Sequence, residues 1–154
     1  MLESTRKEDL KMEKYVEMKE RHQKLIDELP LKFAFSNEQF KNAMEELGLT
    51  ENDTDKVVGI GGGGFCLPET AEKLVNYYKQ FNEEEEKAFK NDDFLQSAFE
   101  YELANHEYII TYDLYDTLVA LNISVKEYQE NERYQKIMSK AIKNYKKDME
   151  RFGW

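Results

Sequence analysis

Glu102 and His106 have the spacing best suited to chemistry, within the stretch ELANHEY. If one helix continues through His106, the two side chains lie one turn apart on the same face. A carboxylate and an imidazole placed in this way can hold a divalent metal or carry out acid–base chemistry. Asp113 and Asp116 could converge on them from beyond the next predicted strand. A usable metal site needs at least three convergent ligands, and only one pair has a defined spacing, so we predict no metal or cofactor.

The same stretch also has a structural interpretation, which we favour. Asn105 and His106 would end the helix and satisfy its last carbonyl groups. Glu102 would then accept hydrogen bonds from the loop amides of a predicted hairpin. The catalytic interpretation stays open as the alternative.

Four consecutive glycines, Gly61–Gly64, occupy the centre of VVGIGGGGFCLPET. Phosphate-binding loops need glycines, but they also need a defined motif that leads directly into a helix, and neither common motif is present. No Lys or Arg lies between Lys56 and Lys73 to neutralise a phosphate. The glycines therefore predict a hairpin turn with a bulge, with a flexible contact loop and a nucleotide site as the alternatives. Cys66 could act as a nucleophile beside His106, but a cysteine in an apolar strand is usually inert.

An N-terminal helix is predicted from Ser4 to Leu29, where Pro30 ends it. It could pack on the core of its own chain or form a coiled-coil seam between copies. Two heptads are short for a coiled coil, so we favour the first. Its apolar side chains recur every three or four residues on one stripe, namely Tyr15, Met18, His22, Leu25 and Leu29.

Strand patterns occur at residues 31–35, 56–60, 65–67 and 108–112, and the glycines join the second and third into a hairpin. A long helix begins near Glu69, and the final helix is amphipathic, with a break expected near Asn131. Predicted helix-capping residues are Ser36 with Gln39, Asp92 with Asp93, and Ser124. The pattern predicts an α+β fold, with a small antiparallel sheet of three or four strands packed against several helices. We expect a helical extension at residues 1–30 and a single α+β domain at 31–154.

The charge is unevenly distributed over the 154 residues, whose formal net charge is −10. Residues 30–124 contain 19 acidic and 7 basic groups, and the last thirty residues are net basic. Such an acidic region repels nucleic acid phosphates and attracts basic surfaces, so we expect a basic protein partner and no direct nucleic acid binding by this region. The candidate contact residues are Glu83, Glu84, Glu85, Glu86, Asp92 and Asp93.

The chain contains a single cysteine and no run of about 18 apolar residues. Its first ten residues do not resemble a secretory signal. These features predict a soluble cytoplasmic protein that does not enter a membrane.

The segments GIGGGGF and ELANHEYIITYD, followed by DTLVALNIS, resemble a family of small uncharacterised proteins carried by phages and mobile elements of Gram-positive bacteria. The resemblance covers about residues 33–147. It implies a role in phage–host conflict, in which small acidic proteins include inhibitors of CRISPR effector nucleases. It assigns no catalytic residue.

Our first hypothesis is therefore a non-enzymatic acidic protein that inhibits a nucleic-acid-handling enzyme of the host cell, with a type II CRISPR nuclease as the partner that the resemblance implies. The second is a small metal-dependent or nucleotide-related enzyme that uses Glu102, His106 and Gly61–Gly64. The third is an oligomeric regulatory module built on the stripe from Tyr15 to Leu29. The sequence leaves the oligomeric state open.

Overall fold

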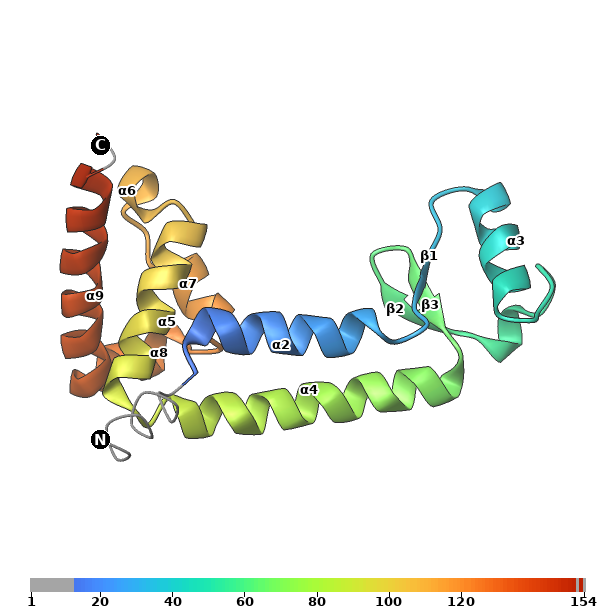
Figure 1. Cartoon of the computed structure of the whole chain (residues 1–154), viewed down its shortest axis with the longest axis horizontal. Helices are drawn as coiled ribbons and strands as arrows, with labels where there is room; N and C mark the ends of the chain where they lie inside the picture. Colours follow the sequence, from blue (N-terminus) through green and yellow to red (C-terminus); the bar gives the residue numbers. More distant parts are fainter. Residues whose placement is uncertain (1–12, 152, 154) are drawn as a thin grey trace, which may run out of the picture. The chain divides into compact units, whose positions relative to one another are not determined.

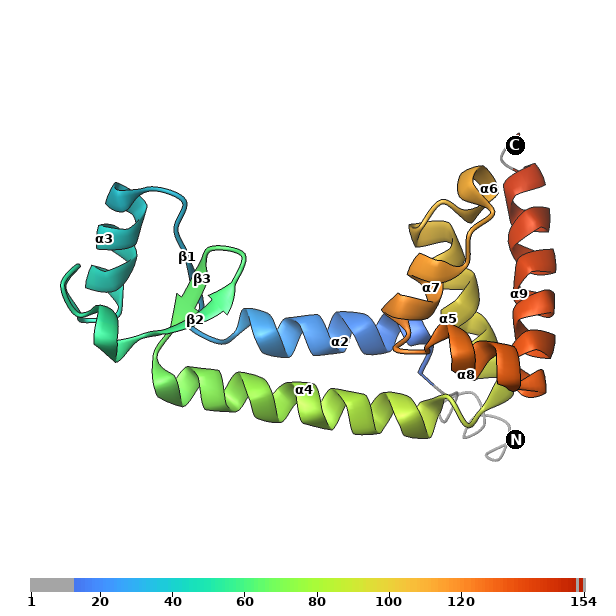
Figure 2. The same cartoon turned by 180° about the vertical axis from the view of Figure 1, so that it is seen from behind.

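A computed structural model describes residues 13–151 and 153 of the chain, which divide into two compact units (Figures 1 and 2). The sheet unit contains Glu20–Glu84, and the helical unit contains the chain up to Lys19 and from Glu85 onward. The boundaries fall inside two helices, α2 (Tyr15–Asp27) and α4 (Pro68–Ala88). The predicted division into a helical extension at residues 1–30 and one domain at 31–154 has different boundaries from these compact units. It stays a prediction about which parts of the chain fold as domains.

Three short antiparallel strands form the sheet of the sheet unit: β1 (Lys32–Phe33), β2 (Val58–Gly61) and β3 (Gly64–Cys66). The strand order is β1-β3-β2, and β2 follows a short 3-10 helix, η1 (Thr54–Lys56). The register of β2 against β3 shifts between Gly59 and Gly61. The predicted hairpin with a bulge is therefore confirmed.

Helix α3 (Asn37–Glu46) packs on the sheet and contributes a small core of its own. A variant of the predicted capping box is formed, because Gln39 N donates to Ser36 Oγ at 3.2 Å, while Gln39 Oε1 accepts at 2.8 Å from Phe35 N, the residue before the N-cap. Met44 is fully buried there, and the Phe40 ring lies 5.1 Å from the ring of Phe65. Phe65 thus fixes which face of the sheet is covered.

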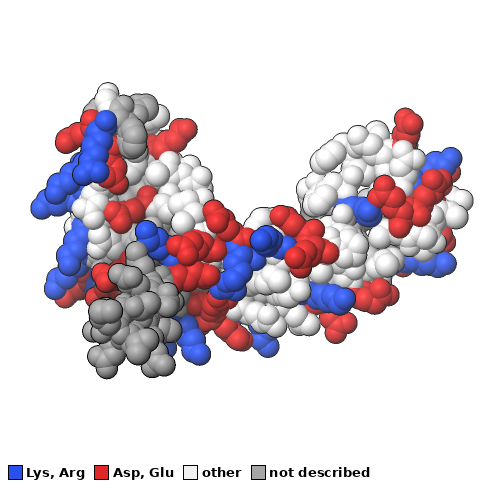
Figure 3. All heavy atoms as spheres, viewed as in Figure 1, with Lys and Arg blue, Asp and Glu red and all other residues white. Residues whose placement is uncertain are grey.

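The helical unit is built on α5 (Asp92–Asn105) and α9 (Glu132–Arg151), which pack along one another. Asn91 Oδ1 accepts from Phe94 N at 2.9 Å, so Asn91 caps α5, and the predicted Asp92 and Asp93 occupy the first turn. Helix α9 buries its apolar face, and Figure 3 shows the lysines along its outer side. The core between the helices includes Leu95, Phe99, Leu103, Met138 and Ala141, all with no exposed surface.

Three short helices connect α5 to α9: α6 (Tyr108–Thr111), α7 (Tyr115–Ala120) and α8 (Val125–Glu130). The predicted break near Asn131 and the Ser124 cap are confirmed, since Ser124 Oγ accepts from Glu127 N at 3.0 Å. The predicted strand at residues 108–112 is wrong, because this segment forms α6. Strand preference depends on a neighbouring strand, and here the backbone is satisfied within the turn instead.

Three residues of the predicted stripe, Tyr15, Met18 and His22, are buried within their own chain, whereas Leu25 and Leu29 are half-buried and Leu29 lies beyond the end of α2. Tyr15 and Met18 belong to the core of the helical unit. In the sheet unit, the His22 ring stacks on Phe81 of α4 with 3.8 Å between ring centroids, so α2 and α4 lie side by side there (Figure 1). The predicted start at Ser4 lies outside the described residues, and residues 13 and 14 are not helical.

Helix α4 has a narrower buried face than its spacing suggests. Leu74 and Phe81 are buried, but Val75 and Tyr78, which were predicted to face inward, are exposed.

The α+β class, with an antiparallel sheet of three strands and several helices, is confirmed. Within the described part of the chain, the helices are too short or too polar to cross a membrane.

Candidate functional site: a buried carboxylate and an acidic surface

Glu102 lies in the interior of the helical unit, where it accepts a hydrogen bond from a tyrosine. The Tyr15 hydroxyl donates to Glu102 Oε1 at 2.7 Å, and the two side chains are 1% and 3% exposed. α2 supplies Tyr15 and the third turn of α5 supplies Glu102. A carboxylate buried to this extent is costly unless it is hydrogen-bonded, and this contact supplies a strong, charge-assisted bond.

The second oxygen of Glu102 faces the end of its own helix. Glu102 Oε2 lies 3.4 Å from Asn105 Nδ2 and 3.1 Å from His106 Nε2. His106 is the C-cap of α5, so the predicted helix end at Asn105 and His106 is confirmed. The predicted bond from Glu102 to the glycine loop is wrong, because Tyr15, Asn105 and His106 take both of its oxygens. We refer to these four residues as the Glu102 cluster.

Burial raises the pKa of two groups in and near the Glu102 cluster. Burial, followed by the hydrogen bond to Glu102, raises the pKa of Tyr15 well above its ordinary value. Burial also raises the pKa of Glu85 against the opposing influence of Lys19, whose Nζ lies 5.7 Å from the centre of the Tyr15 ring. The cluster therefore keeps Tyr15 protonated, and its hydroxyl remains a donor to Glu102.

Replacing Tyr15 with phenylalanine is expected to reduce the rate at which the free energy of unfolding falls as the pH rises above about 10. The folded pKa of Tyr15 is raised, so above about pH 10 the unfolded chain releases a proton that the folded chain retains. Stability then falls by up to about 1.4 kcal/mol per pH unit, and Tyr15→Phe removes this contribution. Urea unfolding of both chains between pH 7 and pH 11 measures it. Parallel curves above pH 10 would contradict the prediction.

The other candidate metal or acid–base residues do not join the Glu102 cluster. Asp113 Oδ1 accepts from Tyr115 N at 2.8 Å, and both Asp113 and Asp116 are exposed. Among the described residues, no group of three His, Cys, Asp or Glu side chains is arranged to hold a metal ion. Cys66 is buried in the sheet unit, and burial raises the pKa of its thiol, which opposes the reactive thiolate form.

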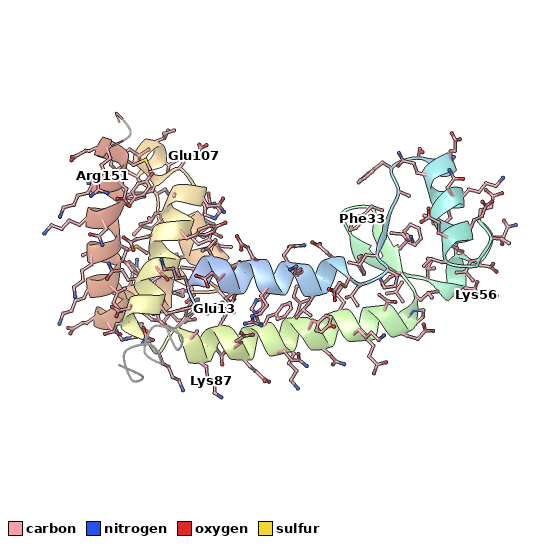
Figure 4. The ribbon with its side chains drawn as sticks, viewed as in Figure 1. Glu13, Phe33, Lys56, Lys87, Glu107 and Arg151 are labelled. Atoms are coloured by element: carbon pink, nitrogen blue, oxygen red, sulfur yellow. The ribbon has the colours of Figure 1, made fainter. Side chains whose placement is uncertain are left out.

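The glycine loop makes the hairpin turn. Gly61, Gly62 and Gly63 have φ of 87°, 58° and 79°, a backbone conformation that other residues rarely adopt. Gly64 continues β3, where a Cβ atom would lie 2.7 Å from Phe33 Cε1. Figure 4 shows Phe33 beside the hairpin. Close packing therefore requires the glycine at this position, while backbone conformation requires the three before it.

The run Glu83–Glu86 is only partly available to a partner. Glu84 forms an ion pair with Arg21 and lies 2.9 Å from His22 Nε2 through Oε2, so it joins α4 to α2 inside the sheet unit. Glu85 belongs to the helical unit and is half-buried. Glu83 and Glu86 are exposed. Charge reversal at Glu84 or Glu85 would thus disturb the fold as well as the surface.

Asp92 and Asp93 are both exposed in the first turn of α5. Arg133 Nε donates to Asp92 Oδ1 at 2.7 Å, and its Nη2 donates to the Phe89 carbonyl at 2.5 Å. Asp92 therefore fixes the start of α5 against the start of α9. Of the six predicted contact residues, Glu86 and Asp93 are therefore the two in the helical unit that are exposed and lie outside the Asp92–Arg133 pair.

Two features of the structure lay outside the sequence predictions. Tyr15 is the partner of Glu102 although 87 residues separate them, and no local pattern connects them. Large apolar side chains are also exposed on α6, which was predicted to be a strand, and on α7. The density of tyrosine in this stretch was the available signal.

The fold and the Glu102 cluster define a small α+β protein in which a helical unit encloses an internally satisfied carboxylate. The chain belongs to a family of unknown function, DUF7659, which matches residues 14–144. The match includes α2 and most of α9. No curated protein and no solved structure matches the chain.

Proposed function

We propose that this chain is a non-enzymatic interaction protein that binds a basic protein surface and thereby inhibits a nucleic-acid-handling enzyme. The observation that supports it is the separation of charge within the helical unit. Residues 91–125, which contain α5, α6 and α7, carry seven acidic residues and no Lys or Arg. The lysines of that unit are concentrated on α9, where Lys136, Lys140, Lys143 and Lys147 are exposed.

This distribution favours a basic macromolecule over nucleic acid. Carboxylates gathered on one part of a surface produce a local negative potential that speeds association with a positive partner and repels phosphates. Glu86, Asp93, Glu107, Asp113 and Asp116 are all exposed carboxylates of the helical unit. Electrostatic complementarity of this kind sets the association rate and the choice of partner, and neighbouring apolar side chains supply the remaining affinity.

A nucleic-acid-handling enzyme is the partner class that fits this chemistry. Such enzymes hold the phosphate backbone in basic channels, and type II CRISPR effector nucleases hold the guide–target duplex in this way. An acidic protein that occupies such a channel competes with the nucleic acid without any chemistry of its own. The phage-protein resemblance supports this partner, and the proposal extends to it on that ground.

The state of Glu102 supports a binding role over the catalytic alternative. The side chain is buried, and its two oxygens lie within hydrogen-bonding distance of Tyr15, Asn105 and His106 of the same unit. The glycines of the suggested nucleotide site belong to the other compact unit. The observation against the third hypothesis is that Tyr15, Met18 and His22 of the predicted stripe are buried within the chain, which leaves the half-buried Leu25 and Leu29 for contact with another copy.

Neutralising Glu86 and Asp93 together, as Glu86→Gln with Asp93→Asn, is expected to weaken binding to a type II effector–guide complex at least tenfold. Both groups are exposed in the helical unit, so their loss reduces its negative potential. Titration calorimetry with the purified complex, together with a DNA cleavage assay, measures binding and inhibition. Wild-type affinity should fall by an order of magnitude or more between about 50 and about 200 mM salt.

The matched control is Glu38→Gln with Glu45→Gln, which makes the same charge change on α3 of the sheet unit. It should weaken binding less than twofold. Equal losses in both double variants would show that net charge alone governs binding. Absence of wild-type binding would contradict the CRISPR partner, and binding that does not depend on salt would contradict the electrostatic proposal itself.

A further inference from the structure

Four large apolar side chains stand exposed within ten residues of the helical unit, on α6, α7 and the turn between them. Ile110 is 60% exposed, Tyr112 62%, and both Tyr115 and Val119 57%. Single exposed apolar residues are ordinary on protein surfaces, whereas several within one short segment make that segment a candidate interaction surface. We refer to residues 107–119 as the α6–α7 segment.

The backbone of this segment is strained at two positions. Glu107 and Tyr112, which flank α6, both have φ of 53°, a left-handed conformation that glycine normally occupies. Figure 4 shows Glu107 where the chain leaves α5. Strain of this kind persists only where surrounding contacts enforce it, and it is concentrated at functional sites. Here it places an exposed tyrosine at the end of a tight helical turn.

Hydrogen bonds hold the segment in this form. Ile109 N donates to the hydroxyl of Tyr145 on α9 at 3.1 Å, and Tyr112 N donates to the Tyr108 carbonyl at 2.8 Å. Beyond the turn, Tyr115 N, at the first residue of α7, donates to Asp113 Oδ1 at 2.8 Å. The exposed side chains therefore project from an ordered backbone. Binding a partner would need little further ordering of this backbone, so the entropy cost of binding is small.

The chemistry of the segment suits a cation with a flat face. Glu107, Asp113 and Asp116 are exposed carboxylates of the same segment, and Asp113 and Asp116 directly follow Tyr112 and Tyr115 in the chain. The Tyr112 ring already has a cation near it, since Lys146 Nζ lies 5.8 Å from its centre. A guanidinium group can stack on tyrosine and pair with a carboxylate at the same time, whereas an ammonium group has no flat face to stack.

We propose that the α6–α7 segment is the part of the chain that docks a basic partner, and that it selects arginine side chains of that partner. Guanidinium groups stack on Tyr112 and Tyr115 and pair with Asp113 and Asp116, and Ile110 and Val119 cover the stem carbons of the same side chains. This inference rests on the proposed function, because it names the residues that recognise the basic protein.

Titration of the full-length chain with an octa-arginine peptide, followed by amide NMR, tests the proposal. The largest chemical-shift changes are expected between residues 107 and 119. An octa-lysine peptide of equal charge should bind at least fivefold more weakly. Tyr112→Ala with Tyr115→Ala should remove this preference, so that both peptides bind with the lower affinity.

Two further variants separate the contributions. Asp113→Asn with Asp116→Asn should weaken both peptides, and the asparagine at position 113 can still accept the hydrogen bond from Tyr115 N. Tyr78→Ala, at an exposed tyrosine of the sheet unit, is the matched control and should change nothing. Circular dichroism confirms that each variant keeps its helices.

The outcomes distinguish this proposal from the function on which it rests. If the arginine peptide binds but shifts residues around Glu86 and Asp93 instead, the chain has a basic partner and the α6–α7 segment does not dock it. Equal binding of the two peptides to the wild-type chain would overturn arginine selection. If neither peptide binds even at low salt, the proposed function itself fails.

Discussion

Replacing Glu102 with alanine is expected to lower the free energy of unfolding of the helical unit by about 2–4 kcal/mol. The change leaves the Tyr15 hydroxyl buried without its acceptor, and it opens a small cavity beside the core of α5. An unpaired buried polar group costs about 1–3 kcal/mol, and the lost packing adds to this. Hydrogen exchange of peptides from α5 and α9, measured by mass spectrometry, reports the loss in this unit alone.

The control for this variant is Glu130→Ala, which removes an exposed carboxylate of α8 in the same unit. It should stay within about 0.5 kcal/mol of the wild-type chain. A second control is the double variant Tyr15→Phe with Glu102→Ala, which should be less destabilised than the sum of the two single changes, because they remove the same bond. Wild-type or higher stability of Glu102→Ala would mean that the carboxylate is kept at a cost to the fold, which would favour the catalytic alternative.

Replacing Gly64 with alanine is expected to destabilise the sheet unit by about 2–3 kcal/mol. The new Cβ atom would lie 2.7 Å from Phe33 Cε1, 2.8 Å from Ile60 Cγ1 and 3.0 Å from the Gly61 carbonyl oxygen. The phenylalanine can move, but Gly61 pairs with Gly64 in the sheet, so the carbonyl contact forces the two strands apart. Any relief therefore costs backbone hydrogen bonds.

The rate at which a thiol reagent labels Cys66 measures this effect. Cys66 is the single cysteine of the chain, and it is buried two residues beyond Gly64, so labelling requires the sheet to open. The rate should rise at least tenfold in Gly64→Ala. Gly59→Ala is the matched control, since a Cβ atom there meets nothing within 4 Å and φ is not positive. A similar rate in both variants would show that the close contacts at Gly64 do not limit the fold.

Local signals in the sequence predicted most of the elements correctly. The Ser36–Gln39 variant of the capping box, the Ser124 cap and the glycine hairpin each depend on residues within a few positions of one another, and all three are formed. The amphipathic α9 was equally evident, because its apolar and lysine positions alternate with a helical period. Short-range physics suffices for such features.

Long-range contacts decided what the sequence could not predict. Glu102 accepts a hydrogen bond from Tyr15, which lies on a different helix. Its spacing to His106 suggested acid–base chemistry, whereas the bond from the buried Tyr15 hydroxyl gives Glu102 a structural role. Residues 108–112 have the composition of a strand, yet the described part of the helical unit contains no strand to pair with, so a strained helical turn forms instead. The division of Glu83–Glu86 into internal and exposed groups likewise required the positions of Arg21 and His22.

The hydroxyl of Tyr145 connects the last helix, α9, to the short helix α6. It accepts a hydrogen bond from the backbone N–H of Ile109, which lies 36 residues earlier, so α9 helps to set the shape of the α6 turn. The family match ends at residue 144, immediately before this tyrosine. Any shortened chain that stops there would keep every carboxylate of the turn and lose the anchor that orients them.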